Sequence, residues 1–147
     1  MLTRVATEQR VTPASQNSQI YVGWHDAVNS TRVTDGVYWA YNSASSGVNW
    51  TAVVSSASVS SSVTTSGFPV DLNYTWLGIY INPQWSRATY FYSTDSSTWN
   101  IATEISASTS ISSSQTGFGV TINKTVGTTA HLVAVDLLAH RYDTSRG

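Results

Sequence analysis

Apolar and β-branched residues occur along the chain in short runs, and polar or turn-forming residues separate the runs. Runs of about 4–8 residues bounded by Gly, Pro, Asn, Asp or Ser are typical of β-strands. No segment keeps a helical period over three turns, although residues 133–140 compete weakly as a helix. The pattern predicts strands at Gln19–His25, Val37–Asn42, Trp50–Val54, Trp76–Asn82, Thr89–Ser93, Trp99–Ile105, Phe118–Lys124 and His131–Leu138.

This number of short strands predicts two packed sheets or a barrel. The chain has 147 residues, which fits one domain with a single hydrophobic core. Its 20 Thr, together with Val, Ile, Tyr and Trp, favour strands over helices. We therefore predict one all-β domain.

The segment Ala88–Ile105 predicts a hairpin. Tyr90 and Tyr92 share one face of the first strand because side chains alternate along a strand. Ser93–Ser97 form the loop, whose length is usual for a hairpin. The return strand places four residues on one face, which we interpret as a core face rather than a ligand surface. These residues are Trp99, Ile101, Thr103 and Ile105.

Two parts of the chain resemble each other at an offset of 50 residues. Each has a Trp-led strand, a Ser-rich stretch and a Gly-Phe pair, at Gly67-Phe68 and at Gly117-Phe118. One interpretation is an internal duplication. The other is that two antiparallel pairs follow the same local rules. In both, the Ser-rich stretches suit solvent-facing strands or loops.

Composition limits the partners. Charged residues make up only 10% of the chain, the formal net charge is −1 and there is one Lys, so no basic stripe predicts nucleic-acid binding. No apolar run has the roughly 20 residues of a membrane span, and the N-terminus lacks the order of a signal peptide. Without Cys, disulfides and thiolate metal sites are excluded. We expect no nucleic-acid or membrane partner.

The sequence also lacks the usual catalytic signatures. The only glutamates are Glu8 and Glu104, and neither has the nearby carboxylate of a glycosidase pair. No G-x-S-x-G elbow and no phosphate-binding loop occur. His25 and Asp26 are adjacent, so on a strand they point to opposite faces, and we interpret them as a loop-capping pair. We expect no enzyme activity, no cofactor and no metal site.

Aromatic residues suggest one binding chemistry. Six Trp and eight Tyr supply flat faces for sugar rings, and they cannot all be core because each indole N–H needs a partner. Trp85 lies in a turn, where burial is difficult, although a Trp lid over one end of the fold is an equal alternative. The glycan-binding candidates are Trp85, Trp39 and Tyr41 for stacking and Asn82, Gln84 and Asp95 for hydrogen bonding.

Aromatic and glycine motifs follow one another in a definite order. They are GVYWAY (36–41), SGVNW (46–50), SGFPV (66–70), TWLGIYIN (75–82), TYFYSTDSSTW (89–99) and GFGVTINKTVGTTAHLVAVDLLAHRYDTSRG (117–147). This order resembles the concanavalin A-like (LamG-like) jelly-roll domains of tailed-bacteriophage virion proteins. The resemblance covers about residues 19–142 and implies a two-sheet antiparallel jelly-roll sandwich. Two departures are the hairpin turn Asp95-Ser96-Ser97, where relatives often have Asn-Gly, and a chain that starts almost at the second strand.

The resemblance divides the chain into an N-terminal arm or first strand (1–18), a sandwich domain (19–142) and a tail (143–147). It implies a non-enzymatic virion structural protein, a capsid decoration or a tail or fibre module, assembled in the host cytoplasm. The N-terminal arm would contact other virion proteins, and a homo-oligomer is a further expectation. The alternative is a lectin-like module that binds a host surface glycan, because jelly rolls carry several functions.

Overall fold

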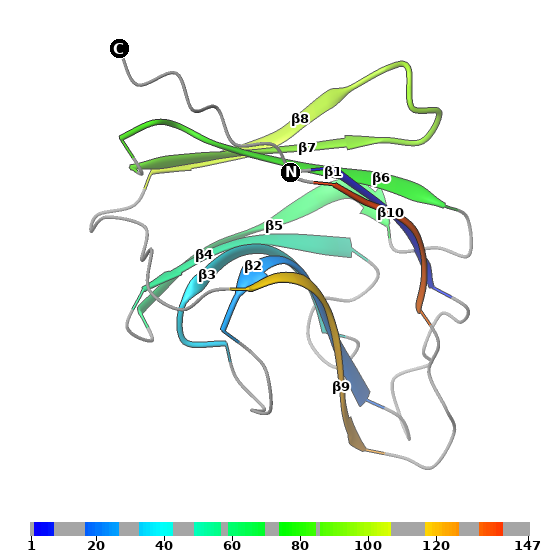
Figure 1. Ribbon diagram of the computed structural model, residues 1–147, viewed down its shortest axis with the longest axis horizontal. Coiled ribbons are helices and arrows are strands. Elements are labelled where there is room, and N and C mark those ends of the chain that lie inside the picture. The colour runs from blue at the N-terminus through cyan, green and yellow to red at the C-terminus, as the bar shows by residue number, and fades with distance from the viewer. Residues whose placement is uncertain are drawn as a thin grey trace.

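The computed structural model describes residues 2–7, 17–26, 33–42, 49–56, 59–69, 74–84, 86–106, 117–126 and 133–139. All regular elements in these ranges are strands (Figure 1). They are β1 (Leu2–Thr7), β2 (Asn17–His25), β3 (Gly36–Asn42), β4 (Asn49–Ser56), β5 (Val59–Pro69), β6 (Thr75–Ile81), β7 (Arg87–Ser93), β8 (Asn100–Ser106), β9 (Gly117–Val126) and β10 (Val133–Ala139).

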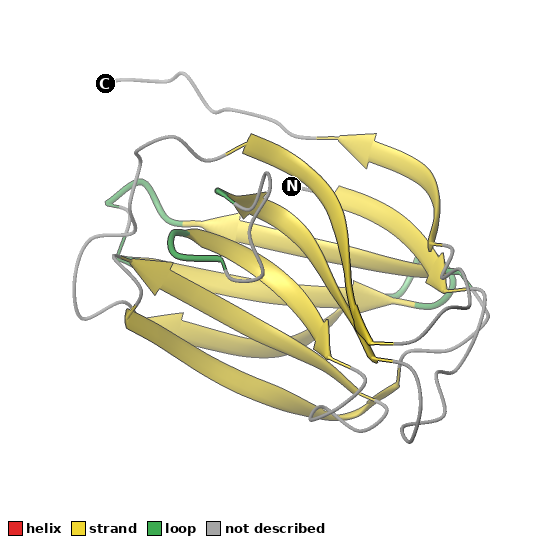
Figure 2. Cartoon of the chain, turned by 90° about the horizontal axis from the view of Figure 1, so that it is seen from below, coloured by secondary structure: helices red, strands yellow, loops and turns green. Residues whose placement is uncertain are grey.

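The strands form two antiparallel sheets that face each other as two layers (Figures 1 and 2). One sheet has the order β10-β1-β6-β7-β8 and the other has the order β5-β4-β3-β2-β9. Strands distant in sequence pair in a nested way, since β1 pairs with β10 and β2 pairs with β9. The predicted all-β sandwich of two antiparallel sheets is confirmed.

All eight predicted strands occur, with shifted ends, as β2, β3, β4, β6, β7, β8, β9 and β10. The strand β1 has only six residues with little apolar alternation, and the sequence left residues 1–18 open between an arm and a first strand. Leu2–Thr7 in fact lie inside a sheet, between β10 and β6. The first Ser-rich stretch forms the edge strand β5, and residues 107–116 of the second lie outside the described residues. The tail at 143–147 lies outside the described residues.

The core lies between the sheets, where reciprocal contacts join them. Trp39 of β3 is fully buried, and its indole Nε1 donates a hydrogen bond to the Gly78 carbonyl oxygen of the opposite sheet over 3.3 Å. Tyr90 of β7 donates from its hydroxyl to the Val53 carbonyl oxygen in the other direction. The two rings meet edge to face with centroids 5.2 Å apart. Burial strongly raises the pKa of Tyr90, which keeps this donor protonated.

The two similar halves of the sequence occupy different places in the fold. The strands β4 and β5 pair with each other within one sheet. At the offset of 50 residues, β4 corresponds to β8, which lies in the other sheet. The counterpart of β5 is residues 109–119, of which 117–119 are described and begin β9, in the same sheet as β5.

Candidate functional site

Two of the predicted sugar-stacking residues lie in the core. Trp39 is 0% exposed and Tyr41 is 4% exposed. Tyr41 packs on Trp50, with ring centroids 6.2 Å apart. Neither ring has a solvent-facing surface on which a sugar could stack, which corrects their assignment to a glycan site. Both residues belong to the inward-facing set of β3, and the sequence alone did not indicate which face of that strand is covered.

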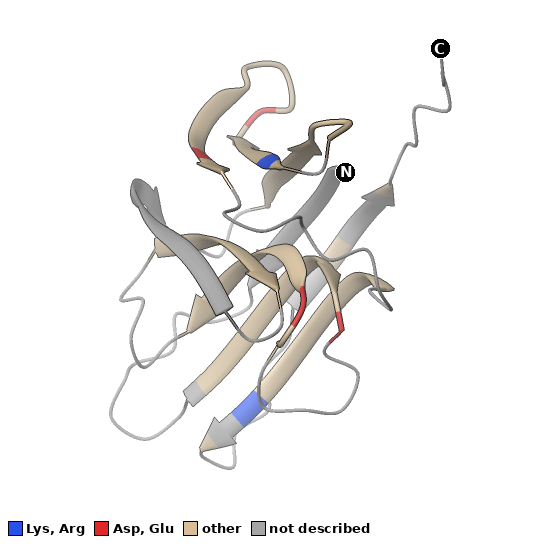
Figure 3. Ribbon diagram, turned by 90° about the vertical axis from the view of Figure 1, so that its left-hand side faces the viewer, with Lys and Arg blue, Asp and Glu red and all other residues tan. Residues whose placement is uncertain are grey.

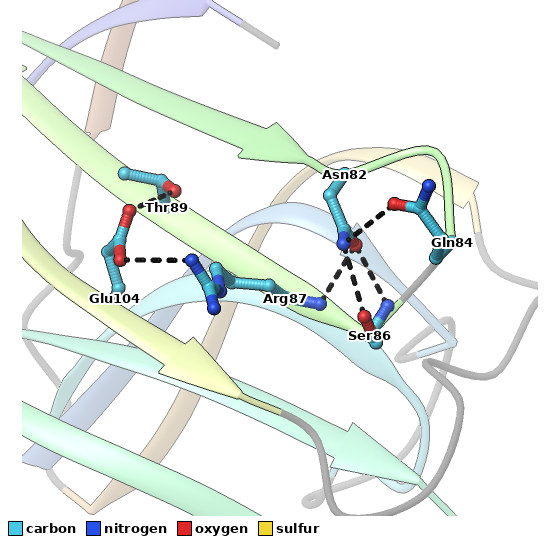
Figure 4. A network of polar contacts seen from close by, with 6 residues as sticks. All are labelled: Asn82, Gln84, Ser86, Arg87, Thr89 and Glu104. Carbon is cyan, nitrogen blue, oxygen red and sulfur yellow. Dashed lines mark hydrogen bonds and ion pairs between the residues drawn. The ribbon is translucent and has the colours of Figure 1, made fainter.

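Asn82 and Gln84, which were predicted to bind a glycan, lie in the turn between β6 and β7. The Asn82 carboxamide oxygen accepts hydrogen bonds from the Ser86 and Arg87 backbone N–H groups, each over 2.9 Å (Figure 4). Its amide nitrogen donates to the Gln84 Oε1 and Ser86 Oγ atoms over 3.1 Å. The Asn82 side chain therefore organises the β6–β7 connection. Gln84 is exposed, and Trp85 lies outside the described residues.

The Asp95 side chain likewise accepts hydrogen bonds from the backbone of its own loop, which connects β7 and β8. Its Oδ1 atom accepts hydrogen bonds from the Thr98 N–H over 2.7 Å and from the Ser97 N–H over 2.9 Å. The Ser93 hydroxyl donates to the same atom over 3.0 Å. These backbone donors hold the pKa of Asp95 well below its usual range. The Asp95 carboxylate therefore organises the loop of this hairpin.

An exposed group of apolar side chains lies on the outer surface of β6, β7 and β8. Along β6, Leu77 and Ile79 point into the core, so the alternate positions face outward. The residue pairs Gly78–Phe91 and Phe91–Ile101 are in register across the three strands. We call this surface the aromatic face and define it by Trp76, Gly78, Tyr80, Phe91, Trp99 and Ile101.

The part of the aromatic face that Ile101 and Trp99 supply depends on a bulge in β8. Between Tyr90 and Phe91 of β7 the partner residue changes from Thr103 to Ile101, so β8 has one extra residue at this point. A bulge of this kind reverses which alternate positions face the core. Ile105 is consequently buried, whereas Ile101 is 64% exposed and Trp99 is 39% exposed. The predicted single core face of this strand is wrong for these two residues.

Gly78 makes room for the Trp99 indole on this surface. A Cβ atom added at Gly78 would lie 3.3 Å from Cζ3 of Trp99 and 3.3 Å from Cβ of Phe91. The six-membered ring of the indole thus covers the glycine, and part of the ring system remains accessible to solvent. The motif TWLGIYIN contained a signal for this face, because Trp76, Gly78 and Tyr80 alternate with core residues.

A polar group borders the aromatic face. Arg87 Nη1 lies 3.7 Å from Glu104 Oε2, and the Thr89 hydroxyl donates to Glu104 Oε1 over 3.0 Å (Figure 4). Thr89 is in register with Tyr80 on one side and with Glu104 on the other. An aromatic ring, a cation and a carboxylate therefore lie side by side on one sheet surface, a combination that can stack on a ligand and both donate and accept hydrogen bonds.

No family model, curated protein or solved structure matches this chain. Charged residues are sparse over the described part of the chain (Figure 3). No group of three or more His, Asp or Glu that could hold a metal ion occurs among the described residues. Within the same ranges, no helix has the length and hydropathy needed to cross a membrane.

The predicted loop-capping role is confirmed for Asp26. Its Oδ1 atom accepts a hydrogen bond from the Thr34 N–H over 3.0 Å, its Oδ2 atom accepts one from the Thr34 hydroxyl, and its own N–H donates to the Asp35 carbonyl oxygen over 3.1 Å. Burial tends to raise the pKa of Asp26, but these hydrogen bonds together lower it. The carboxylate thereby closes the connection between β2 and β3.

His25 points to the opposite face of β2 and is buried beside Tyr21 and Tyr38, each with its ring centroid 6.1 Å away. Burial lowers its pKa, and the nearby Asp26 carboxylate and Gly119 backbone oppose this shift only in part. Neither ring nitrogen has a hydrogen-bond partner of normal geometry among the described residues. His25 is therefore neutral at pH 7 and packs as an aromatic side chain.

We expect this histidine to make the fold less stable in mild acid. Its pKa is lower in the folded chain than the ordinary value of about 6.5, so the unfolded chain binds the proton first. Stability should be complete above about pH 6.5 and should fall, by at most ~1.4 kcal/mol per pH unit, as the pH drops toward the folded-state pKa. Urea unfolding from pH 7.5 to 5 would measure this decline.

The variant His25→Phe is the control for this prediction, because it keeps a ring between the two tyrosines and removes the titrating group. Its unfolding free energy should be flatter over the same pH range. Asp26 and Asp95 leave this window unaffected, since their lowered pKa values matter only below about pH 4. An equally steep decline in the variant would contradict the role of His25.

Proposed function

We propose that this chain is a non-enzymatic structural module of a tailed-bacteriophage virion and that its sandwich is a concanavalin A-like jelly roll. The observation that carries the proposal is the position of the resemblance motifs in the fold. GVYWAY lies in β3, TWLGIYI forms β6 and TYFYS lies in β7, so each of these three motifs coincides with a strand. The nested pairs β1–β10 and β2–β9 are the pairings expected of a rolled sandwich.

The surface composition supports this role. With 24 Ser and 20 Thr and few charges, the chain presents neutral hydroxyl groups that suit packing beside other subunits in a particle. On this proposal its partners are other virion proteins, copies of itself included, and it reaches the virion during assembly in the host cytoplasm. Within the particle, the chain would decorate the capsid or form part of a tail or fibre.

The position of β1 inside a sheet makes an N-terminal truncation unsuitable as a test of attachment. The sequence left residues 1–18 open between an arm and a first strand, and an arm could be removed without loss of the domain. Because β1 hydrogen-bonds to β10 on one side and to β6 on the other, deleting residues 2–15 removes an internal strand. We expect this truncation to unfold the domain, so a loss of incorporation in such a variant would say nothing about attachment.

Association of the intact chain with particles is the direct test. An antibody raised against the purified protein should label virions separated on a density gradient from lysates in which the chain is made. The label should persist after a wash in about 1 M salt, which screens weak contacts between exposed charges. Recovery of the chain only in the unassembled fraction would contradict a structural role in the virion.

A further inference from the structure

We propose that the aromatic face binds a neutral carbohydrate chain, with Trp99 and Tyr80 as the stacking residues and Arg87 and Glu104 as the hydrogen-bonding residues. This inference goes beyond the structural role proposed above, and it places a glycan site away from most of the residues that the sequence suggested. It depends on three features of the surface: the exposure of the rings, the support beneath Trp99 and the polar border.

The exposure of this surface differs from that of an ordinary sheet face. Tyr80 is 55% exposed and Trp99 is 39% exposed, and Ile101, which is 64% exposed, lies on the same face. Contiguous exposed apolar side chains with a polar rim mark binding surfaces in soluble proteins. Tyr80 lies on β6, and Trp99, at the end of the β7–β8 loop, packs on Gly78 of the same strand, so both rings are positioned by one sheet.

The sheet itself supports Trp99. The indole covers Gly78 and contacts the position where a Cβ atom would lie at 3.3 Å, so the ring cannot sink further toward the sheet. Its other side remains accessible. Such a supported aromatic ring loses little conformational freedom when a flat ligand binds, which favours affinity.

The polar border explains why we assign a carbohydrate. Arg87 and Glu104 lie 3.7 Å apart and neutralise each other, so the surface lacks the net positive charge that a phosphate or an acidic partner would need. Together they offer donors and an acceptor side by side. Adjacent hydroxyl groups of a sugar both accept and donate hydrogen bonds, and the apolar C–H face of the sugar ring packs on an aromatic ring. The aromatic face supplies both requirements in one place.

The test is native electrophoresis in gels containing hydroxyethyl cellulose, dextran or mannan, with the polysaccharide concentration varied to give an apparent Kd. We expect the full chain to be retarded in at least one gel. Trp99→Ala should weaken binding by about tenfold or more, by analogy with bases that stack on aromatic residues. Glu104→Gln, which removes the charge and keeps the size, should also weaken it.

Two further variants separate binding from folding. Gly78→Ala keeps every aromatic residue but adds a Cβ atom against Trp99, so it should displace the indole and weaken binding. Val126→Ala alters an exposed apolar side chain on the other sheet and should bind like the unmodified chain. Thermal unfolding of each variant establishes that it is folded in the gel.

Several results would overturn the inference. One is the absence of retardation in all three gels. Another is that the Trp99→Ala variant is retarded as strongly as the unmodified chain. Light scattering adds a third: a dimer that Trp99→Ala dissociates would assign the aromatic face to a second copy of the chain. Virion labelling is independent of all three, so failure of the carbohydrate site and failure of the structural role are distinguishable.

Discussion

Replacing Gly23 with alanine is expected to lower the free energy of unfolding by about 3 kcal/mol or more. Gly23 has φ of +147°, a conformation that residues with a side chain rarely adopt. An added Cβ atom would lie 2.5 Å from the Val37 carbonyl oxygen and 2.8 Å from the Tyr38 Cα atom. Both neighbours are backbone atoms of the paired strand, so relief requires β2 and β3 to separate.

Gly119→Ala is a matched control for this prediction. Gly119 is the partner of Gly23 on the neighbouring strand β9, but a Cβ atom there would meet nothing within 4 Å. An alanine at a compatible site restricts the unfolded chain, so this variant should be neutral or slightly stabilising. Urea unfolding of both proteins would measure the difference, and similar stabilities would contradict the strain assigned to Gly23.

Gly23 and Gly78 both lie on outer surfaces of the sheets, where neighbouring atoms occupy the space that a side chain would need. Gly23 is in register with Tyr38, whose ring packs against Tyr21 at 5.5 Å and against His25 at 6.1 Å. A Cβ atom at Gly23 would meet the backbone of the paired strand, whereas one at Gly78 would meet the Trp99 ring and the Phe91 Cβ atom. Gly23 therefore allows a close approach of two strands, and Gly78 makes room for an aromatic ring. The Tyr38 ring beside Gly23 is buried, whereas the Trp99 ring is accessible.

The positions of most strands could be predicted because period-two alternation and turn residues are local signals. Which face of β8 points into the core could not be predicted in this way. The bulge that turns Ile101 outward depends on pairing with β7, and the spacing of apolar residues in β8 alone is compatible with one continuous core face. The strand β1 is short, and what makes it a strand is its position between β10 and β6, which are distant in sequence.

Local sequence signals were also insufficient to predict which candidate site residues are free to contact a ligand. Local sequence correctly placed Asp95 in a loop and placed Asn82 at the end of a strand, one residue beyond the end of β6. The side-chain oxygens Asn82 Oδ1 and Asp95 Oδ1 accept hydrogen bonds from the turns themselves. Whether an aromatic residue is core or surface depends on the layer it faces. Trp39 was assigned to a ligand and is core, and Trp99 was assigned to the core and is exposed. Only the pairing of the two sheets separates these cases.

That difference between the two tryptophans predicts a large difference in stability. Trp39→Ala should destabilise the fold by about 4 kcal/mol, because removing a buried tryptophan leaves a cavity. The variant also loses the hydrogen bond to the Gly78 carbonyl oxygen and the edge-to-face contact with Tyr90, both of which join the two sheets. Trp99→Ala should cost about 1 kcal/mol or less, because the lost side chain is partly exposed.

Denaturant unfolding of the two variants, followed by far-ultraviolet circular dichroism, would measure both values without relying on tryptophan fluorescence. Trp39→Phe refines the comparison, since it keeps a ring beside Tyr90 and removes only the N–H donor and part of the volume. Its stability should lie between those of Trp39→Ala and the unmodified chain. If Trp99→Ala were as destabilising as Trp39→Ala, Trp99 would be a core residue, and the aromatic face would contribute to folding instead of offering a surface to a ligand.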